Sequence, residues 1–158
     1  MITVDSTDIR LVRALSDDPR STFVALANRL GFSRNTIQAR MSRLEESNTF
    51  LSFDRRISPA AIGYPLTAFI DVHLQQKRLA EIVAKLALIP EIVEAHGMSG
   101  DADLQIRVVC TDADDLFRID GTILAVDGVE RTATSLAMSE LIPYRVQPLL
   151  DRGLESAD

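Results

Sequence analysis

The chain has 158 residues, a length that fits one ordinary domain or two small ones. Apolar types make up 46% and charged types 25%, which supplies material for packed cores and excludes a wholly disordered chain. No apolar run reaches the roughly 18 residues of a membrane span, and the first residues lack a signal-peptide profile. The single cysteine, Cys110, excludes an internal disulfide and a Cys-based zinc site. We therefore expect a soluble cytoplasmic protein with no membrane partner.

Charge is distributed unevenly along the chain. The whole carries 17 basic and 23 acidic residues, for a net charge of −6. Residues 1–65 hold nine Arg and seven acids, whereas residues 66–158 hold eight basic and sixteen acidic residues. Because charges beyond a Debye length of about 8 Å are largely screened, phosphate attraction is decided locally. The split favours a DNA-binding module joined to a module that does not bind DNA, although small domains also reach such a balance by chance.

Two helices are predicted in the first thirty residues. Asp5 or Ser6 can cap the first, and the run 17–19, which ends in proline, stops it. Ser21 can cap the second, and Gly31 follows its last apolar residue, where a left-handed residue normally ends a helix. The side chains expected to face the core are Ile9, Leu11, Val12 and Leu15 in the first helix and Val24, Leu26, Ala27 and Leu30 in the second.

A third helix begins after Ser33 and is expected to end at Asn48, a common left-handed residue. Ala27, Gly31 and Ile37 stand at the spacing of a helix-turn-helix unit. The small residue allows a close crossing, the glycine allows the turn, and the branched residue fills the shared core. The inward residues of the third helix are predicted to be Ile37, Met41 and Leu44.

The opposite face of the third helix has no acidic residue before Glu45. It carries Asn and Gln, which pair bidentately with adenine, and Arg, which pairs with guanine. This pattern predicts reading of double-stranded DNA in the major groove. The residues expected to contact bases are Arg34, Asn35, Gln38 and Arg43. Those expected at phosphates are Thr36, Arg40, Arg55 and Arg56, and Ser33 at the helix start completes the predicted DNA-binding set.

The remainder of the chain changes period from helix to alternating strands. Residues 49–57 predict a short strand or wing, and Pro and Gly mark 58–65 as a linker. Strands are predicted over 66–74, 92–98, 104–110 and 129–138, with helices over 79–86 and after Asp112, the latter with Leu116, Phe117 and Ile123 inward. The order β-α-β-β-α-β is that of a ferredoxin-like sandwich with both helices on one face of the sheet.

The predicted fold class is therefore α+β, with a winged helix-turn-helix domain followed by a ferredoxin-like domain. The expected divisions are 1–50 for the helix-turn-helix domain, 51–65 for wing and linker, 66–140 for the ferredoxin-like domain, and 141–158 for a C-terminal extension that packs on the surface and ends in a polar tail.

The sheet face without helices can be interpreted in two ways. It would hold Asp71, His73, Arg107 and, on the neighbouring strand, Glu94 and His96. Two histidines and a carboxylate can form a metal or catalytic set, but nothing in the spacing enforces their convergence. The half-apolar character of the face, which includes Phe69 and Val109, favours pairing with another subunit.

The loop 97–104, GMSGDADL, also has two interpretations. It can be an ordinary hairpin turn around Gly100-Asp101. As a site, its backbone N–H groups would bind a carboxylate, while Asp101 or Asp103 would bind an ammonium group.

The whole arrangement resembles the Lrp/AsnC (feast/famine) family of transcriptional regulators over nearly all of residues 3–140. The residues that carry the resemblance are VDSTDIRLVRAL, LANRLGFSRNTIQARMSRLEE, DRRISPAAIGYPLTAFIDV, PEIVEAHGMSGDADLQIRV and DGVERTAT. The resemblance implies an effector domain that dimerises through its sheet, assembles further into tetramers or octamers, and binds a free amino acid near the loop between the second and third strands.

By position, Gly100 and Asp103 match the family's glycine and aspartate in that loop, and Ser99 replaces a usual threonine. The predicted effector-binding residues are Met98, Ser99, Gly100, Asp101 and Asp103. Ala102 departs from the family because an aromatic residue is common there. Asn48-Thr49-Phe50 replaces a usual Gly-Val-Ile, and Asn48 can supply the same left-handed turn.

We therefore predict a sequence-specific DNA-binding regulator, a homodimer or larger, that responds to a small amino-acid-like effector. We expect no cofactor, no metal and no catalytic residues. One alternative is an architectural protein that coats DNA with little sequence preference and binds no effector. The other is an enzyme on the same scaffold that uses His73 or His96.

Overall fold

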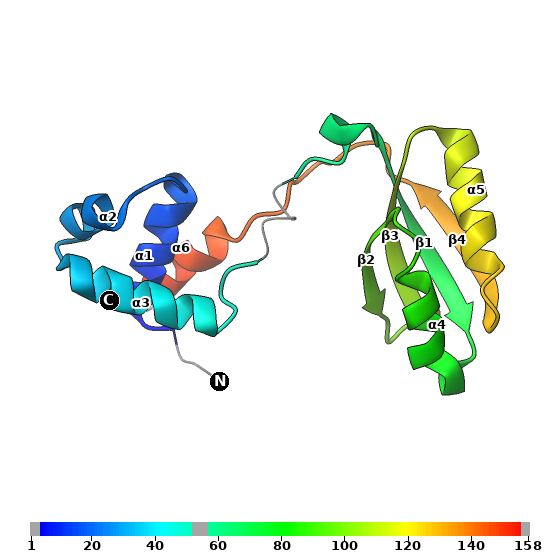
Figure 1. Cartoon of the computed structure of the whole chain (residues 1–158), viewed down its shortest axis with the longest axis horizontal. Helices are drawn as coiled ribbons and strands as arrows, with labels where there is room; N and C mark the ends of the chain where they lie inside the picture. The colour runs from blue at the N-terminus through cyan, green and yellow to red at the C-terminus, as the bar shows by residue number, and fades with distance from the viewer. Residues whose placement is uncertain (1–3, 52–56, 156–158) are drawn as a thin grey trace. The chain divides into compact units, whose positions relative to one another are not determined.

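The computed structural model of the chain describes residues 4–51 and 57–155 and divides into two compact units (Figure 1). The N-terminal unit comprises residues 1–53 together with 142–158, and the C-terminal unit comprises residues 54–141. Among the described residues, no helix combines the length and the apolar character needed to cross a bilayer.

Three capped helices build most of the N-terminal unit. They are α1 (Ser6–Asp17), α2 (Phe23–Leu30) and α3 (Arg34–Glu46), with Asp5, Thr22 and Ser33 as their N-caps. Each cap side chain accepts a hydrogen bond from a backbone N–H of the first turn and so satisfies a donor that the helix leaves free. The predicted cap at Ser21 is therefore one residue early.

Two left-handed residues end the second and third helices. Gly31 has φ 76° and Asn48 has φ 56°, and both positions were expected from the sequence. The predicted strand or wing over 49–57 falls mainly on residues 52–56, which lie outside the described residues.

The core of the N-terminal unit lies where the three helices meet, and its fully or almost fully buried apolar residues are Leu11, Ala14, Leu26, Ala27, Ile37, Met41 and Leu44. One inward prediction is wrong, because Val24 is 53% exposed. It precedes the buried Leu26 by two residues, which places it about 200° around the helix from that side chain.

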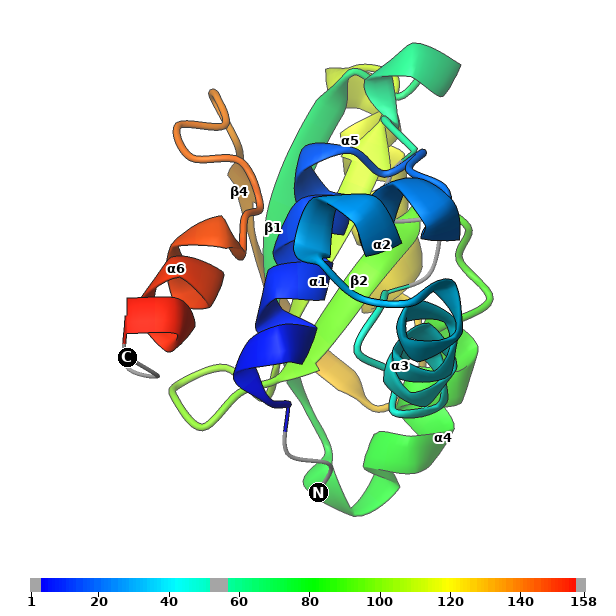
Figure 2. The same cartoon turned by 90° about the vertical axis from the view of Figure 1, so that its left-hand side faces the viewer.

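A fourth helix, α6 (Gln147–Glu155), packs against α1 and completes the N-terminal unit. It lies on the side of α1 away from α3 (Figure 2). The prediction of a polar tail is therefore wrong for residues 151–155, which are helical. Arg13 of α1 forms an ion pair with Asp151. A nine-residue helix containing Pro148 and Gly153 has little stability by itself, so packing on α1 explains why it forms.

The C-terminal unit is a four-stranded antiparallel sheet in the order β2-β3-β1-β4, as the ferredoxin-like prediction requires. Its strands are β1 (Leu66–Leu74), β2 (Ile92–Gly97), β3 (Leu104–Cys110) and β4 (Val129–Leu136). Its helices are α4 (Leu79–Leu86) and α5 (Ala113–Leu124), and the short 3-10 turns are η2 (Ala60–Ile62) and η3 (Gln76–Arg78). Asp112 caps α5 as expected.

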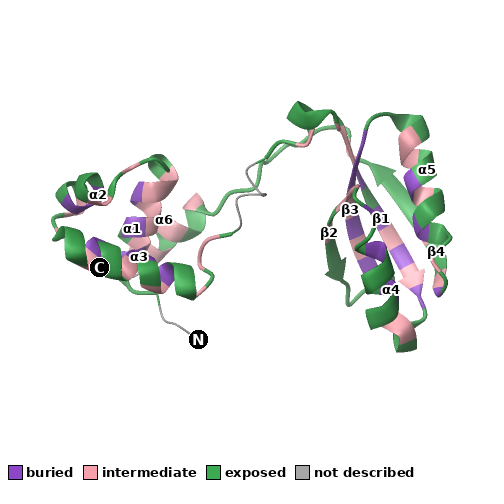
Figure 3. Ribbon diagram, viewed as in Figure 1, coloured by how far each residue is buried: buried purple, intermediate pink, exposed green. Residues whose placement is uncertain are grey.

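Helices α4 and α5 cover one face of this sheet and bury its alternate residues (Figure 3). The core includes Ile70 of β1, Ile106 of β3, Ile82 of α4 and Ile119 of α5. The inward prediction for Phe117 is wrong, because this side chain is 82% exposed. Phe117 precedes Ile119 by two residues, so the two side chains point to nearly opposite sides of α5.

Candidate DNA-binding and effector sites

The exposed face of α3 carries short polar side chains, while the opposite face of the helix is buried. Asn35 and Gln38 are exposed, and so is Ala39, which directly follows Gln38. Ile37, Met41 and Leu44 are buried on the opposite face, which fixes the rotation of the helix about its axis. The face therefore offers two amide groups around a small residue, a surface that can approach base edges closely.

The start of α3 is organised by two hydroxyl groups. Ser33 Oγ accepts a hydrogen bond from the backbone N–H of Thr36 at 3.1 Å, and the two hydroxyl oxygens lie 2.8 Å apart. Thr36 is half-buried, whereas Arg34 is exposed. The first turn of the helix is thus held in place, with a cationic side chain beside the positive end of the helix dipole.

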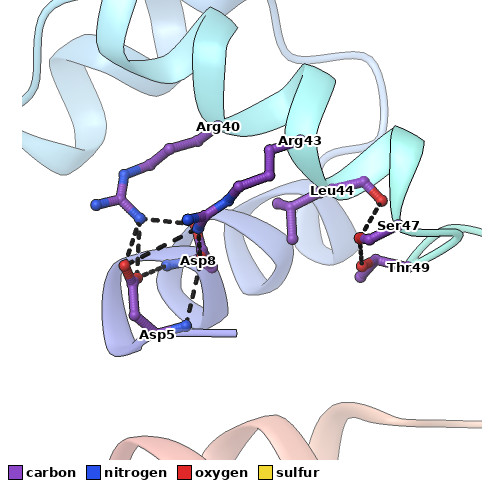
Figure 4. Close-up of polar contacts among 7 residues, drawn as sticks. All are labelled: Asp5, Asp8, Arg40, Arg43, Leu44, Ser47 and Thr49. Carbon is purple, nitrogen blue, oxygen red and sulfur yellow. Dashed lines mark hydrogen bonds and ion pairs between the residues drawn. The ribbon is translucent and has the colours of Figure 1, made fainter. Parts of the chain in front are cut away.

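The two arginines in the second half of α3 are held by the start of α1 (Figure 4). Arg40 Nη1 donates to both carboxylate oxygens of Asp5, at 2.9 and 2.7 Å, and to Asp8 Oδ1 at 2.7 Å. Arg43 Nη2 donates to Asp8 Oδ2, and lies 4.0 Å from Asp5 Oδ2. Four charged groups with a net charge of zero therefore join α1 to α3.

Asp8 is the buried member of this group, with no exposed surface. The carboxylate also accepts the backbone N–H of Asp5 at 3.1 Å, while Asp5 Oδ1 accepts the backbone N–H of Asp8 at 2.8 Å, which completes a capping box. The hydrogen bond from Arg40 holds the pKa of Asp5 below its ordinary value, and the same contact raises the pKa of Arg40. Asp5 and Arg40 thus each stabilise the ionised form of the other.

This geometry differs from the expected layout of α3. Arg40 and Arg43 are bound to α1, so the exposed face of α3 is narrower than helical periodicity predicts and centres on Asn35, Gln38 and Ser42. Helical periodicity accounts only for the apolar contacts of α3. A signal was available in the spacing, because two acids three residues apart at a helix start match a pair of arginines three residues apart on α3.

The other predicted phosphate contacts, Arg55 and Arg56, lie outside the described residues. Of the predicted DNA-binding residues, the structure thus brings together Ser33 to Gln38 at the start of α3. Arg40 and Arg43 are set apart from this group, because both form ion pairs with acidic residues at the start of α1.

The loop between β2 and β3 borders a cavity of about 360 Å³ on the sheet face opposite the helices. Three predicted effector residues line it, namely Met98, Gly100 and Asp101, and Ala102 lines it as well. The strands contribute charged and polar groups, namely Asp71, His73, Gln105 and Arg131. Both charge signs are therefore present beside the loop, as a zwitterionic ligand would require.

The charged groups of the cavity are linked loosely. Arg131 Nη2 lies 2.7 Å from His73 Nε2, and the 94% exposed Asp101 side chain lies 3.6 Å from Arg131 Nη2 and 3.7 Å from His73 Nε2. Gln105 Nε2 donates to Asp71 Oδ1 at 3.1 Å. Asp101 is thus close to the guanidinium group of Arg131 and the imidazole of His73, while most of its surface stays open to solvent.

Asp103 has a different place from the other predicted effector residues. Its carboxylate accepts the backbone N–H of Leu74 at 2.8 Å and Gln76 Nε2 at 2.5 Å. The bond from Leu74 is the main reason that the pKa of Asp103 is lowered. Its backbone oxygen accepts the N–H of Met98 at 2.9 Å. Asp103 therefore fixes the loop to the end of β1, and neither it nor the exposed Ser99 lines the cavity.

The histidines do not form a metal set with their neighbours. Within residues 4–51 and 57–155, no three His, Cys, Asp or Glu side chains are close enough together to hold a metal ion. His96 Nε2 instead lies 3.1 Å from Glu94 Oε1.

Comparison with known proteins assigns both units. Residues 4–45 match the model of the AsnC-type helix-turn-helix domain, and residues 67–147 match that of the Lrp/AsnC ligand binding domain. The chain belongs to the Lrp/AsnC family. It is accordingly a transcriptional regulator of the Lrp/AsnC type with a helix-turn-helix DNA-binding domain.

Similar proteins come from archaea and bacteria. The chain is 28% identical to the HTH-type transcriptional regulator FL11 of Pyrococcus horikoshii over 137 residues, which cover 87% of this chain and 91% of FL11. E. coli AsnC has a similar structure, with a TM-score of 0.84 and 26% identity over 93% of this chain and 100% of AsnC. The feast or famine regulatory protein from M. tuberculosis, complexed with L-methionine, has a TM-score of 0.81 and 28% identity over 91% and 98% of the two chains.

Proposed function

We propose that this Lrp/AsnC-type regulator binds DNA sequence-specifically through the exposed face of α3, and that a small amino acid bound at the loop between β2 and β3 biases this binding. In the assembly, two helix-turn-helix units related by a twofold axis would read half-sites one helical turn apart, or a multiple of it.

The observation that carries the DNA part is the exposed amide face of α3. Asn35 and Gln38 can each pair bidentately with adenine, and Ala39 leaves room for the helix to approach the groove floor. Arg34 at the helix start is placed to contact a base or a phosphate. We assign Arg40 and Arg43 no base contact, because Arg40 Nη1 and Arg43 Nη2 bind the carboxylates of Asp5 and Asp8 and hold both side chains against α1.

A mobility-shift experiment tests this assignment. The wild-type protein is first used to select a genomic DNA fragment, and its affinity for that fragment is then compared with its affinity for random duplex DNA. The variant with Asn35→Ala and Gln38→Ala should lose most of this preference, because each good bidentate pair contributes about 1–3 kcal/mol of discrimination.

Asn28→Ala is the matched control, because Asn28 is an exposed amide on α2 instead of α3. It should keep the preference for the selected fragment. If the α3 variant keeps the preference too, the base-reading assignment is wrong. If wild type has no preference at all, the protein is an architectural DNA-binding protein.

The effector part is supported by the cavity beside the loop. Arg131 and His73 can bind a carboxylate, while Asp71 and Asp101 can bind an ammonium group. The M. tuberculosis relative solved with L-methionine supports an amino acid as the ligand class. Such a ligand would change DNA binding only if its affinity differs between two assemblies of the protein.

A thermal-shift screen with the twenty amino acids tests this proposal. A ligand at about 100 times its dissociation constant should add about 2.7 kcal/mol to the free energy of unfolding. Asp101→Asn should abolish the shift, whereas Asp114→Asn, which changes an exposed acid on α5, should preserve it. A wild-type protein that none of the twenty stabilises would contradict the effector proposal.

We also propose a homodimer, or a larger assembly, formed through the sheet face without helices. On that face Phe69 is 40% exposed, and Arg107 and Gln105 lie on the neighbouring strand in register with β1. An apolar side chain of this size in the centre of a sheet favours a second subunit as cover. Sedimentation of wild type and Phe69→Glu tests this, and a monomeric wild type would contradict it.

A further inference from the structure

The cluster that joins α1 to α3 contains two carboxylates that differ in accessibility. Asp8 is completely buried, whereas the Asp5 side chain is 45% exposed at the start of α1. Asp8 therefore serves as a permanent structural partner of α3, out of reach of any ligand. Asp5 lies at the surface, where an anion of another molecule can compete with it.

Arg40 is the group for which that competition would take place. Its Nη1 makes all of its contacts to Asp5 and Asp8, and its other terminal nitrogen points away from both carboxylates (Figure 4). The side chain is 26% exposed. Arg40 can thus be reached from solvent while it is held from behind.

The charges around Arg40 determine how strongly a DNA phosphate would be attracted to it. Arg40 and Arg43 together carry two positive charges, and Asp5 and Asp8 cancel both within 4.0 Å. Asp5 repels an approaching phosphate and so offsets part of the attraction between that phosphate and Arg40. Two of the three arginines of α3 therefore offer less positive charge to DNA than the sequence of the helix suggests.

We propose that Asp5 is a positioning residue that restrains Arg40 and thereby weakens the binding of α3 to DNA phosphates of any sequence. The inference rests on the proposed function, because it assigns α3 to DNA. Its consequence is greater specificity. Asp5 weakens the phosphate contacts, which contribute equally to the binding of every DNA sequence. It leaves unchanged the contacts of Asn35 and Gln38, which depend on the bases.

Asp5→Asn tests the proposal directly. Asparagine is as good an N-cap as aspartate, so the hydrogen bond from the backbone N–H of Asp8 is retained while the charge is removed. Affinity for random duplex DNA should rise severalfold, and the salt dependence of binding should steepen by about 0.9 in slope, which corresponds to one additional phosphate contact. The ratio of affinities for selected and random DNA should fall. Asp5→Ser, which also retains a cap, should behave alike, and thermal unfolding shows that both variants are folded.

Two controls separate this mechanism from a general effect of charge. Asp18→Asn removes the same charge at the other end of α1, about 20 Å away, where Asp18 holds the backbone N–H of Arg20 and the hydroxyl of Ser21. It should leave the salt slope unchanged, because the distance exceeds two Debye lengths of about 8 Å. In the double variant Asp5→Asn with Arg40→Gln, the gain in affinity should disappear.

Each outcome is informative. The proposal is supported if Asp5→Asn gains affinity for random duplex DNA, if this gain requires Arg40, and if Asp18→Asn shows no such gain. Unchanged or weaker binding by Asp5→Asn overturns it, as does a gain that persists without Arg40. Random-sequence DNA gives these results independently of base reading, so a wild type that binds DNA without sequence preference overturns only the proposed function. A wild type that binds no duplex DNA overturns both.

Discussion

The two units of the molecule use charged side chains in opposite ways. In the N-terminal unit a buried carboxylate, Asp8, ties α1 to the helix that we assign to DNA, so the same residues that stabilise the unit also set its surface charge. In the C-terminal unit the core between sheet and helices is apolar, and the charged groups of the candidate effector cavity lie at its surface. Substitutions of Asp8 should therefore change stability and function together, whereas in the second unit the two should separate.

The largest expected effect concerns the apolar core of the C-terminal unit. Ile106→Ala removes a fully buried side chain from β3 and should lower the free energy of unfolding of this unit by about 2–5 kcal/mol. Hydrogen exchange of the full chain, read separately for amides of each unit, checks this. An equal loss of protection in α1 to α3 would show that the two units do not unfold separately.

A smaller loss is expected from the buried charge of the N-terminal unit. Asp8→Asn leaves Arg40 and Arg43 without their shared anionic partner and should cost about 1–3 kcal/mol, less than for a fully buried pair because both arginines are partly exposed. Urea unfolding measures the change. Asp17→Asn, which alters an exposed ion pair with Arg29, should change stability much less, because solvent screens that pair. Equal losses for the two variants would show that the buried carboxylate contributes no more to stability than an exposed one.

The separation of stability from function in the C-terminal unit can be tested at two neighbouring aspartates. Asp103→Ala should lower the free energy of unfolding measurably, because the backbone N–H of Leu74 loses its acceptor. Asp101→Asn should leave thermal stability nearly unchanged but remove the effector response. The combined readout is the melting temperature with and without amino acid. A stable Asp103→Ala protein that fails only in ligand binding would instead make Asp103 an effector ligand.

The smallest expected effect is on acid stability. The hydrogen bond from Arg78 lowers the pKa of Glu81 on the surface of α4 from 4.5 to about 2. A lowered folded-state pKa means that the stabilisation is present above pH 4.5 and is lost as the pH falls toward 2. Glu81→Gln should therefore lower stability slightly at neutral pH and flatten the acid part of the stability profile, so that the difference from wild type disappears toward pH 2. Urea unfolding between pH 5 and pH 2.5 measures this change. Equal decreases in the free energy of unfolding of wild type and variant over that range would contradict the prediction.

The sequence predicts those parts of the fold that depend on neighbouring residues. Asp5, Gly31, Ser33, Asn48 and Asp112 end or begin helices as expected, because caps and left-handed turns are decided within a few residues. The strands follow from the alternation of apolar and polar residues, and their order in the sheet follows from the β-α-β-β-α-β arrangement of a ferredoxin-like domain. Helix α6 was missed, because its stabilisation comes from α1, more than a hundred residues earlier in the chain.

The candidate sites show the same limit. The exposed amides of α3 follow from helical periodicity, but the contacts of Arg40 and Arg43 to α1 span 32 to 35 residues and are not encoded in the periodicity of α3. Asp101 and Asp103 look equivalent in the sequence. Only the position of the end of β1 shows that Asp103 is engaged with Leu74 while Asp101 remains open.

Selection of binding sites from a random DNA library tests the central claim most directly, namely that the exposed amides of α3, and not the arginines held by α1, read bases. We expect Arg43→Gln to enrich the same sequence as wild type, with lower affinity, and the variant with Asn35→Ala and Gln38→Ala to enrich no common sequence. The opposite result, in which the amide variant keeps the wild-type sequence and Arg43→Gln changes it, would contradict the account.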